Sequence, residues 1–325
     1  MKLEYWQVYR GGIIKVLIIG SSGQDGRILT NYYRHLGMDV HCASRFRYFE
    51  DSENLHWHLS EIKNETQIYK LLNMIMPDII LHLAGVHGPS NKINDIAKTS
   101  RIEMLHIHVT VTQYLINWCE LNPKTKLFIP LSSKMYSAIG SEKVISSKSE
   151  VSPDSFYGET KAMAFRKIQK AQANGVLVFG AILFTHSSPF SKSGFLLYDI
   201  AQQILDISNN TRRTISLTNA FAYVDISDAR DVCVAIGELL NLNHQTNTVI
   251  GDGKLQVISD IVLKSLEILK IKEVKISSIL SNQGFGLVAD TEEIKKSISG
   301  WNGSRPITRT LVDVVSYLKS GYRNF

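Results

Sequence analysis

Long apolar runs, paired cysteines and an apolar segment of the secretory-signal type near residue 1 are all missing from this sequence. No segment reaches the roughly 18 consecutive apolar residues that a membrane-spanning helix requires, so we expect no membrane partner. The three cysteines, Cys42, Cys119 and Cys233, are far apart, which excludes a paired redox or metal motif and favours a reducing compartment. Residues 1–13 lack the apolar core of a signal peptide and are predicted to be a short N-terminal extension. Together these absences predict a cytoplasmic protein.

Dense blocks of positive charge are also missing, although the formal net charge is +6. Lysine and arginine are scattered along the chain and are not interleaved with aromatic residues. A nucleic-acid partner usually requires such clustering, so we predict none. The excess of positive charge instead favours an anionic small molecule as the partner.

Two histidine pairs stand out among the ten histidines. "HWH" at residues 56–58 would place both imidazoles on one face of a strand, whereas "HIH" at 106–108 would point them to different faces of a helix. Neither pair has a third ligand that the sequence makes evident, and zinc sites use at least three protein ligands. We therefore predict no metal site.

Apolar segments alternate with helical patterns from residue 14 onward. The strands, such as "IIKVLIIG", are continuously apolar, and each is followed by a stretch with helical spacing. This pattern is typical of a parallel sheet that helices cover on both faces. We predict an α/β fold with a doubly wound parallel (Rossmann) sheet over residues 14–186, completed by parts of 220–251. The rhythm breaks after residue 186, so residues 187–325 are predicted to form a smaller, interleaved C-terminal α/β lobe that binds the substrate.

A glycine-rich turn joins the first strand to the helix that follows it. In "VLIIGSSGQDGRIL", three glycines recur at intervals of three residues. Such a turn lets the backbone approach a pyrophosphate, which then lies at the positive end of the helix. We expect a dinucleotide to contact Gly20, Gly23, Gln24, Asp25 and Gly26.

The second strand ends in "HCASRFR", without the carboxylate that normally accepts hydrogen bonds from the ribose 2′-hydroxyl of NAD. Ser44, Arg45 and Arg47 stand there instead. Guanidinium groups suit a 2′-phosphate because they form charge-assisted, bidentate hydrogen bonds. The sequence therefore predicts NADP(H) as the cofactor.

A tyrosine and a lysine lie four residues apart in "SFYGETK", at the start of a predicted helix. This spacing places Tyr157 and Lys161 on one helical face. A phenol with a pKa near 10 is a poor base, but a neighbouring ammonium and a positive nicotinamide ring lower its pKa. Tyr157 would then exchange a proton with a substrate hydroxyl while hydride moves to or from the cofactor.

The order of these motifs resembles the extended short-chain dehydrogenase/reductase family, also described as NAD-dependent epimerases and dehydratases. "GSSGQDG" looks closest to the branch of GDP-mannose 4,6-dehydratases and GDP-4-keto-6-deoxymannose reductases, where G-x-T-G-Q-D-G is usual. This resemblance spans nearly the whole chain. It implies a homodimer with a four-helix interface that includes the helix with "VTQYLINWCE".

The resemblance also implies roles for individual residues. The family's catalytic serine or threonine precedes a motif tyrosine by four residues, which gives Ser132 before Tyr136. Ser132 would orient the substrate oxygen beside Tyr157. "HLAG" is similar to the family strand beneath the nicotinamide, where Ala84 and Gly85 would allow close approach.

Several substrate positions depart from the family pattern. Dehydratases carry a glutamate two residues before the motif tyrosine, and it removes the C5 proton of the sugar. Lys134 stands there, and an ordinary ammonium, with a pKa near 10.4, is not a base at neutral pH. The family's asparagine before His-x-x-Pro is Thr185, and Phe190 or Ser191 takes the place of an arginine. The expected substrate contacts are Ser133, Lys134, Thr185, His186 and Lys192.

The motifs predict an NADP(H)-dependent oxidoreductase, and the resemblance implies that it acts at C4 of a nucleotide-activated sugar, most simply as a 4-keto-6-deoxyhexose reductase. A GDP-mannose-like 4,6-dehydratase with an unusual base is an alternative. A non-catalytic NADP-binding protein on the same fold is a second alternative, and the intact pair of Tyr157 and Lys161 argues against it.

Overall fold

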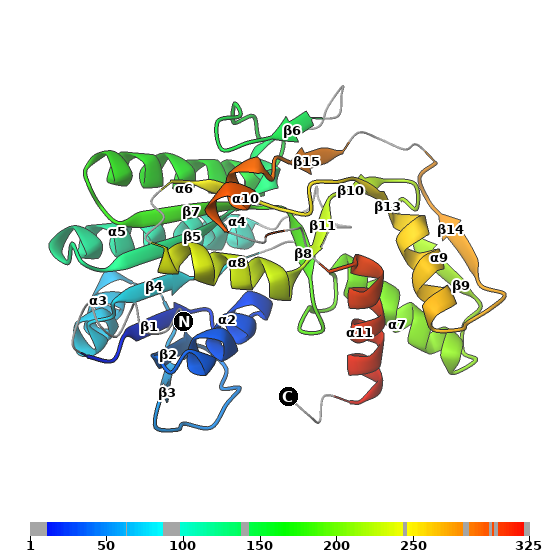
Figure 1. The fold of residues 1–325 in the computed structure, drawn as a ribbon, viewed down its shortest axis with the longest axis horizontal. Helices are drawn as coiled ribbons and strands as arrows, with labels where there is room; N and C mark the ends of the chain where they lie inside the picture. The colour runs from blue at the N-terminus through cyan, green and yellow to red at the C-terminus, as the bar shows by residue number, and fades with distance from the viewer. Residues whose placement is uncertain are drawn as a thin grey trace.

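A seven-stranded parallel sheet forms the centre of the protein (Figure 1). The computed structural model describes residues 12–62, 64–86, 98–137, 143–242, 246–281, 286–298, 301 and 305–321. The strand order is β12-β7-β5-β4-β1-β2-β3. The bounds are β1 Lys15–Ile19, β2 Asp39–Ser44, β3 Leu55–Leu59, β4 Ile79–His82, β5 Lys126–Ser132, β7 Val178–Leu183 and β12 Thr248–Ile250. All neighbouring strands run parallel, which confirms the predicted Rossmann sheet.

Helices cover both faces of the sheet, because alternate residues of each strand face opposite layers. Leu17 and Ile19 of β1 are buried in one core, and Val16 and Ile18 are buried in the other. This double burial explains why the strands are continuously apolar. The first core contains α3 (Glu65–Ile75), α5 (Val111–Leu121) and α6 (Phe156–Ala173), and the second contains α2 (Gln24–His35), α8 (Ala229–Asn241) and part of α10 (Glu292–Ser297).

The helical stretch that the sequence predicts around "HIH" and "VTQYLINWCE" is not one regular α-helix. It consists of α4 (Lys98–Leu105), a π-helical turn η1 (His106–Thr110) and α5. A π-turn accommodates one more residue than an α-turn and so changes which side chains face the neighbouring elements. The homodimer interface that we expect at this helix stays a prediction.

A second lobe has its own apolar core, formed largely by helices α7, α9 and α11 (Figure 1). The helices are α7 Leu196–Ser208, α9 Ile258–Ile268 and α11 Ile307–Lys319. Short strand pairs connect and flank them: β8 Thr185–Ser187 with β11 Ile226–Asp228, β9 Thr214–Leu217 with β14 Lys275–Ser278, and β10 Tyr223–Val224 with β13 Gln256–Val257. A further pair, β6 Lys143–Ile145 with β15 Leu287–Ala289, packs against the first core of the central sheet instead. The fold class is thus confirmed, whereas the lobe boundary at residues 186 and 187 stays a prediction. Within the described ranges, no helix is long and apolar enough to cross a membrane.

Candidate active site

The glycine turn after β1 has a backbone that only glycine adopts readily at its first position. Gly20 has φ of +87°, and a Cβ there would lie 2.5 Å from the backbone nitrogen of Ala84. Gly23 is the N-cap of α2 and provides no side-chain hydrogen bond to the helix, and Gly26 is buried in the first turn. The first N–H groups of α2 are therefore not satisfied by a capping side chain, which suits an anion such as a pyrophosphate.

The side chains of Gln24 and Asp25 connect the glycine turn to the segment that contains β8. The Ser188 hydroxyl donates to Oε1 of Gln24 over 3.0 Å, and Nε2 of His186 lies 3.1 Å from Oδ2 of Asp25. Because both side chains contact this segment, we expect the backbone N–H groups of Gln24 and Asp25 to contact the cofactor. That contact stays a prediction. His186 thus forms an ion pair with a residue 161 positions earlier in the sequence, and its contact with the substrate stays a prediction.

The charge on His186 depends on this ion pair. Burial alone would lower the pKa of His186, but the charge and hydrogen bond of Asp25, helped by the Phe184 carbonyl, raise the pKa to about 9. The imidazole is therefore protonated at neutral pH. It partly neutralises Asp25, whose negative charge raises the pKa of Tyr157.

We expect the His186–Asp25 pair to make the stability of the protein depend on pH. The folded pKa of His186, about 9, exceeds the ordinary value of 6.5, so the stabilisation is complete below pH 6.5 and is lost as the pH rises through 9. A shift of this size corresponds to about 3 kcal/mol. In His186→Gln, the glutamine amide can still donate a hydrogen bond to Asp25 but carries no charge. Between pH 6.5 and pH 9, the unfolding free energy of this variant, measured with urea, should therefore fall by about 3 kcal/mol less than that of the wild type.

The control for this prediction is His35→Gln. His35 is an exposed histidine on α2, and its Nδ1 lies 2.6 Å from the Asn31 carbonyl oxygen of its own helix. Its substitution should leave the pH dependence of the wild type intact. If the unfolding free energy of His186→Gln falls with pH as steeply as that of the wild type, the His186–Asp25 pair is not the group that titrates.

Ser132 and Tyr157 meet at the C-terminal end of β5. A 3₁₀ turn, η2 (Ser133–Met135), follows the strand, and the Ser132 hydroxyl accepts a hydrogen bond from Lys134 N over 3.2 Å. The hydroxyl also forms a hydrogen bond with the phenol of Tyr157. Ser155 caps α6 by accepting a hydrogen bond from Gly158 N, so Tyr157 lies in the first helical turn. The structure therefore brings together the serine and tyrosine that the sequence predicts.

Lys161 is buried one turn after Tyr157. Its Nζ donates to the Pro130 carbonyl over 2.9 Å and lies 5.8 Å from the centre of the Tyr157 ring. Burial lowers the pKa of Lys161 to about 8. Burial also raises the pKa of Tyr157, the hydrogen bond from Ser132 lowers it, and the charge of Asp25 raises it. The net effect raises the pKa of Tyr157, so its phenol is a proton donor in this state.

Lys134 contributes its backbone rather than its side chain to the packing of the site. A Cβ at Gly158 would collide with the Lys134 carbonyl oxygen, which explains why glycine follows Tyr157. The Lys134 side chain is exposed, and Ser133 is buried. Their roles in substrate binding stay predictions.

His108 lies in the site although the sequence did not predict it there. The Thr160 hydroxyl donates to the Tyr157 carbonyl over 2.8 Å, so it accepts from Nδ1 of His108, which is 2.9 Å away. Nε2 of His108 then accepts from Val86 N over 3.2 Å, and the ring packs edge-on against Tyr157 at 5.5 Å. His108 thus joins α6 to the segment that contains Ala84 and Gly85. The "HIH" pattern was visible in the sequence, but the π-turn that directs His108 inward was not.

The three residues at the end of β2 that we predicted to bind a 2′-phosphate differ in their surroundings. The buried Ser44 hydroxyl donates to the Phe46 carbonyl over 2.6 Å, and Arg47 forms an ion pair with Asp51 at 2.9 Å. Arg45 is exposed, with its guanidinium 6.0 Å from the centre of the Phe46 ring. Among the described residues no carboxylate pairs with Arg45, so it is the better placed of the two predicted arginines to meet a phosphate.

Arg27 is a second residue that the sequence did not single out. Its guanidinium lies 4.4 Å from the centre of the Tyr48 ring and 4.2 Å from that of Phe190. Arg27 lies in the first turns of α2, so it adds a positive charge near the glycine turn. Phe190 follows β8, so the stack also connects α2 to the segment after β8. Thr185 and Lys192, from the same segment, are exposed, and their roles in substrate binding stay predictions.

A family model for GDP-mannose 4,6 dehydratase matches residues 17–297. The chain belongs to the GDP-mannose 4,6 dehydratase family. A GDP-mannose 4,6 dehydratase from Cricetulus griseus is 24% identical over 267 residues, which cover 77% of this chain and 70% of that protein. Membership confirms the predicted resemblance and makes the chain an enzyme of the extended short-chain dehydrogenase/reductase type.

Two solved structures illustrate the fold that this member of the GDP-mannose 4,6 dehydratase family shares with other proteins. A dTDP-glucose 4,6-dehydratase from Bacillus anthracis, in complex with NAD, superposes with a TM-score of 0.79 at 15% identity, covering 94% of this chain and 97% of its own. RMD from Pseudomonas aeruginosa, complexed with NADPH, gives 0.74 at 18% identity, covering 95% and 98%. At such identities the likeness concerns the fold.

Proposed function

We propose that this chain uses a nicotinamide cofactor to oxidise or reduce C4 of a nucleotide-linked sugar. The observation that carries the proposal is the arrangement at the end of β5: the Ser132 hydroxyl bonded to the Tyr157 phenol, with the buried Lys161 amine 5.8 Å from the ring. A bound nicotinamide ring supplies the hydride acceptor or donor. Ser132 orients the C4 oxygen of the sugar, and Tyr157 gives or takes its proton.

The surroundings of Tyr157 suit a group that must exchange a proton. Lys161 is fixed by its bond to the Pro130 carbonyl, so a positive charge on it stabilises the phenolate whenever Tyr157 gives up its proton. The hydrogen bond from Ser132 acts in the same direction. The opposing charge of Asp25 is reduced by its ion pair with His186. His108 contacts the Tyr157 ring and fixes the helix backbone through Thr160, which limits movement of the phenol.

NADP(H) is the cofactor we propose. The glycine turn and the uncapped start of α2 would hold its pyrophosphate, and Arg45 at the end of β2 would bind its 2′-phosphate. Arg27 adds positive charge near the same turn.

Arg45→Ala should weaken NADPH binding by about 1.5–3 kcal/mol, the scale of a hydrogen bond to a charged group, and should leave NADH binding almost unchanged. Isothermal titration with both cofactors measures the difference. Arg47→Ala is the matched control, because Arg47 is already paired with Asp51 and should affect NADPH less. Equal wild-type affinity for NADPH and NADH would overturn the choice of NADP(H).

Within this chemistry we propose the 4,6-dehydratase reaction first. The family model and relatives named GDP-mannose 4,6 dehydratase support it better than the reductase that the sequence led us to expect. A dehydratase oxidises C4, removes the C5 proton, expels the C6 hydroxyl and returns the hydride to C6. The 4-keto-6-deoxyhexose reductase is the second candidate, and one observation favours it: an exposed lysine, Lys134, stands where the family has its C5 base.

Isotope exchange separates these candidates. The protein is incubated in D₂O with GDP-mannose and NADP⁺, and separately with NADPH and a nucleotide-linked 4-keto-6-deoxyhexose. A dehydratase gives a 4-keto-6-deoxy product with deuterium at C5 in the NMR spectrum and no net change in NADPH absorbance. A reductase consumes one NADPH for each ketone. Bound cofactor without either reaction would overturn the proposed function and support a non-catalytic NADP-binding protein.

A further inference from the structure

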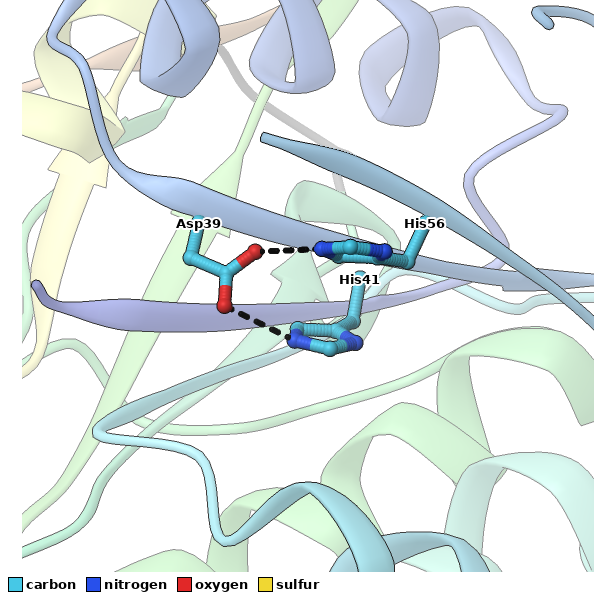
Figure 2. Close-up of side chains that lie close together, drawn as sticks. All are labelled: Asp39, His41 and His56. Carbon is cyan, nitrogen blue, oxygen red and sulfur yellow. Dashed lines mark hydrogen bonds and ion pairs between the residues drawn. The ribbon is translucent and has the colours of Figure 1, made fainter. Parts of the chain in front are cut away.

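Three histidines and an aspartate, residue types that can bind metal ions, gather on one face of β2 and β3, at the edge of the sheet. The parallel register places His41 directly opposite His56. Asp39 precedes His41 by two positions and His58 follows His56 by two, so the pleat directs all four side chains to the same face. Figure 2 shows Asp39, His41 and His56 converging from the two strands.

The ligand atoms in this cluster already lie close together. Oδ1 of Asp39 is 2.8 Å from Nε2 of His56, and Oδ2 of Asp39 is 3.4 Å from Nε2 of His41 (Figure 2). One ligand atom from each of the three residues lies within 4.8 Å of the others. Zinc bonds of about 2.0–2.1 Å in a tetrahedron place neighbouring ligand atoms roughly 3.3 Å apart, so small side-chain movements would complete the site.

Hydrogen bonding within the cluster leaves the carboxylate incompletely satisfied. Oδ1 of Asp39 is buried and has no hydrogen bond of good geometry within the described residues, although Nε2 of His56 is close. A cation between these atoms would satisfy that oxygen. The exposed side-chain fractions are 12% for His41, 20% for Asp39 and 41% for His56, so the site is sheltered on the sheet side and reachable from solvent.

His58 orients His41 in the way that outer partners orient metal ligands. Its Nε2 is 2.9 Å from Nδ1 of His41, and the two rings stack at 5.2 Å. When Nδ1 of His41 carries the proton and donates to His58, Nε2 of His41 presents its lone pair towards Asp39. Such a bond to the second ring nitrogen is usual for a histidine that holds a metal.

We propose that Asp39, His41 and His56 bind a divalent transition-metal ion of the Zn²⁺ class, with His58 as the outer hydrogen-bond partner of His41. Two imidazole nitrogens and one carboxylate oxygen suit Zn²⁺ or Co²⁺, whereas Mg²⁺ and Ca²⁺ prefer oxygen ligands throughout. Water completes the coordination.

The proposed ion lies away from the candidate active site and has a structural role. Asp39 begins β2, whereas the candidate active site lies at the C-terminal ends of the strands, where Ser44 ends β2. The ion joins β2 to the edge strand β3. One of its ligands, His56, lies two positions after the connecting segment, residues 45–54, which includes Arg45.

Metal titration tests the site on the full chain after removal of bound metal with a chelator. Wild type should bind one equivalent of Zn²⁺ by calorimetry and one of Co²⁺ with a visible absorption spectrum, and Zn²⁺ should raise its melting temperature. His58→Gln should weaken Zn²⁺ binding by about 10–100-fold, as expected for an outer partner. His56→Gln and Asp39→Asn, which remove ligands, should weaken it further.

His35→Gln, an exposed histidine on α2, is the control and should bind Zn²⁺ like wild type. Melting curves without metal show whether each variant still folds, so loss of binding can be separated from loss of structure. The proposal is overturned if folded wild type binds neither ion, or if His56→Gln and Asp39→Asn both keep the wild-type affinity and Co²⁺ spectrum.

Discussion

Tyr157→Phe is expected to lower turnover by about 10²–10⁴-fold, the usual contribution of a general acid or base, with almost unchanged cofactor affinity. The substitution removes the phenol oxygen that bonds Ser132 and keeps the ring that packs against His108. The site should therefore keep its shape and lose only its proton donor. Turnover with a nucleotide-sugar substrate and calorimetric NADPH affinity give the two readouts.

Tyr136→Phe is the matched control for this change. Tyr136 is a buried tyrosine just after η2, and its hydroxyl has no hydrogen-bond partner among the residues that the structure describes. Its loss should leave turnover near that of wild type. Turnover above about a tenth of wild type in Tyr157→Phe would be too high for a general acid, and the proton would then come from another group.

Asp225→Ala should destabilise the fold by about 3–5 kcal/mol, as expected when a buried charged acceptor leaves its donors without a partner. Asp225 is 3% exposed and lies between β10 and β11. Its carboxylate accepts hydrogen bonds from the backbone nitrogens of Asp252, Gly253 and Ala289 at 2.8, 3.0 and 2.9 Å. This one side chain therefore holds the turn after β12 and the end of β15.

Two further variants sharpen the Asp225 experiment. Asp225→Asn keeps one side-chain oxygen that can accept hydrogen bonds and replaces the other with an amide NH₂ group. This variant should therefore lose less stability than Asp225→Ala. Asp154→Ala removes an exposed carboxylate and should change stability by no more than about 0.5 kcal/mol. Urea unfolding at neutral pH gives all three values. An Asp225→Ala loss as small as that of Asp154→Ala would mean that water or backbone groups replace the carboxylate at no cost.

The parts of the site that sequence analysis predicted are formed by local motifs or came through family resemblance. The glycine turn is a local motif, because the positive φ of Gly20 and the start of α2 depend on neighbouring residues. Tyr157 and Lys161 were also readable, since helical spacing alone places them together. Ser132 came from the resemblance, and the structure brings it to Tyr157.

The residues that sequence analysis missed depend on contacts between distant elements. Periodicity identifies the face of a helix or strand that a residue occupies, but not its partner on another element. His108 reaches the site because a π-turn interrupts a helix that the pattern predicts to be regular. Asp25 meets His186 only because β8 packs beside the start of α2.

The sequence by itself determined the parallel sheet, the glycine turn and the Tyr157–Lys161 pair, because each follows from the order and spacing of nearby residues. Only the tertiary structure decided which partners these elements receive. It exposed the Lys134 side chain, paired Arg47 with Asp51, and placed Asp39 and His41 beside the "HWH" strand. The register of two strands sets that last contact, and strand register depends on burial in the whole fold rather than on either strand alone.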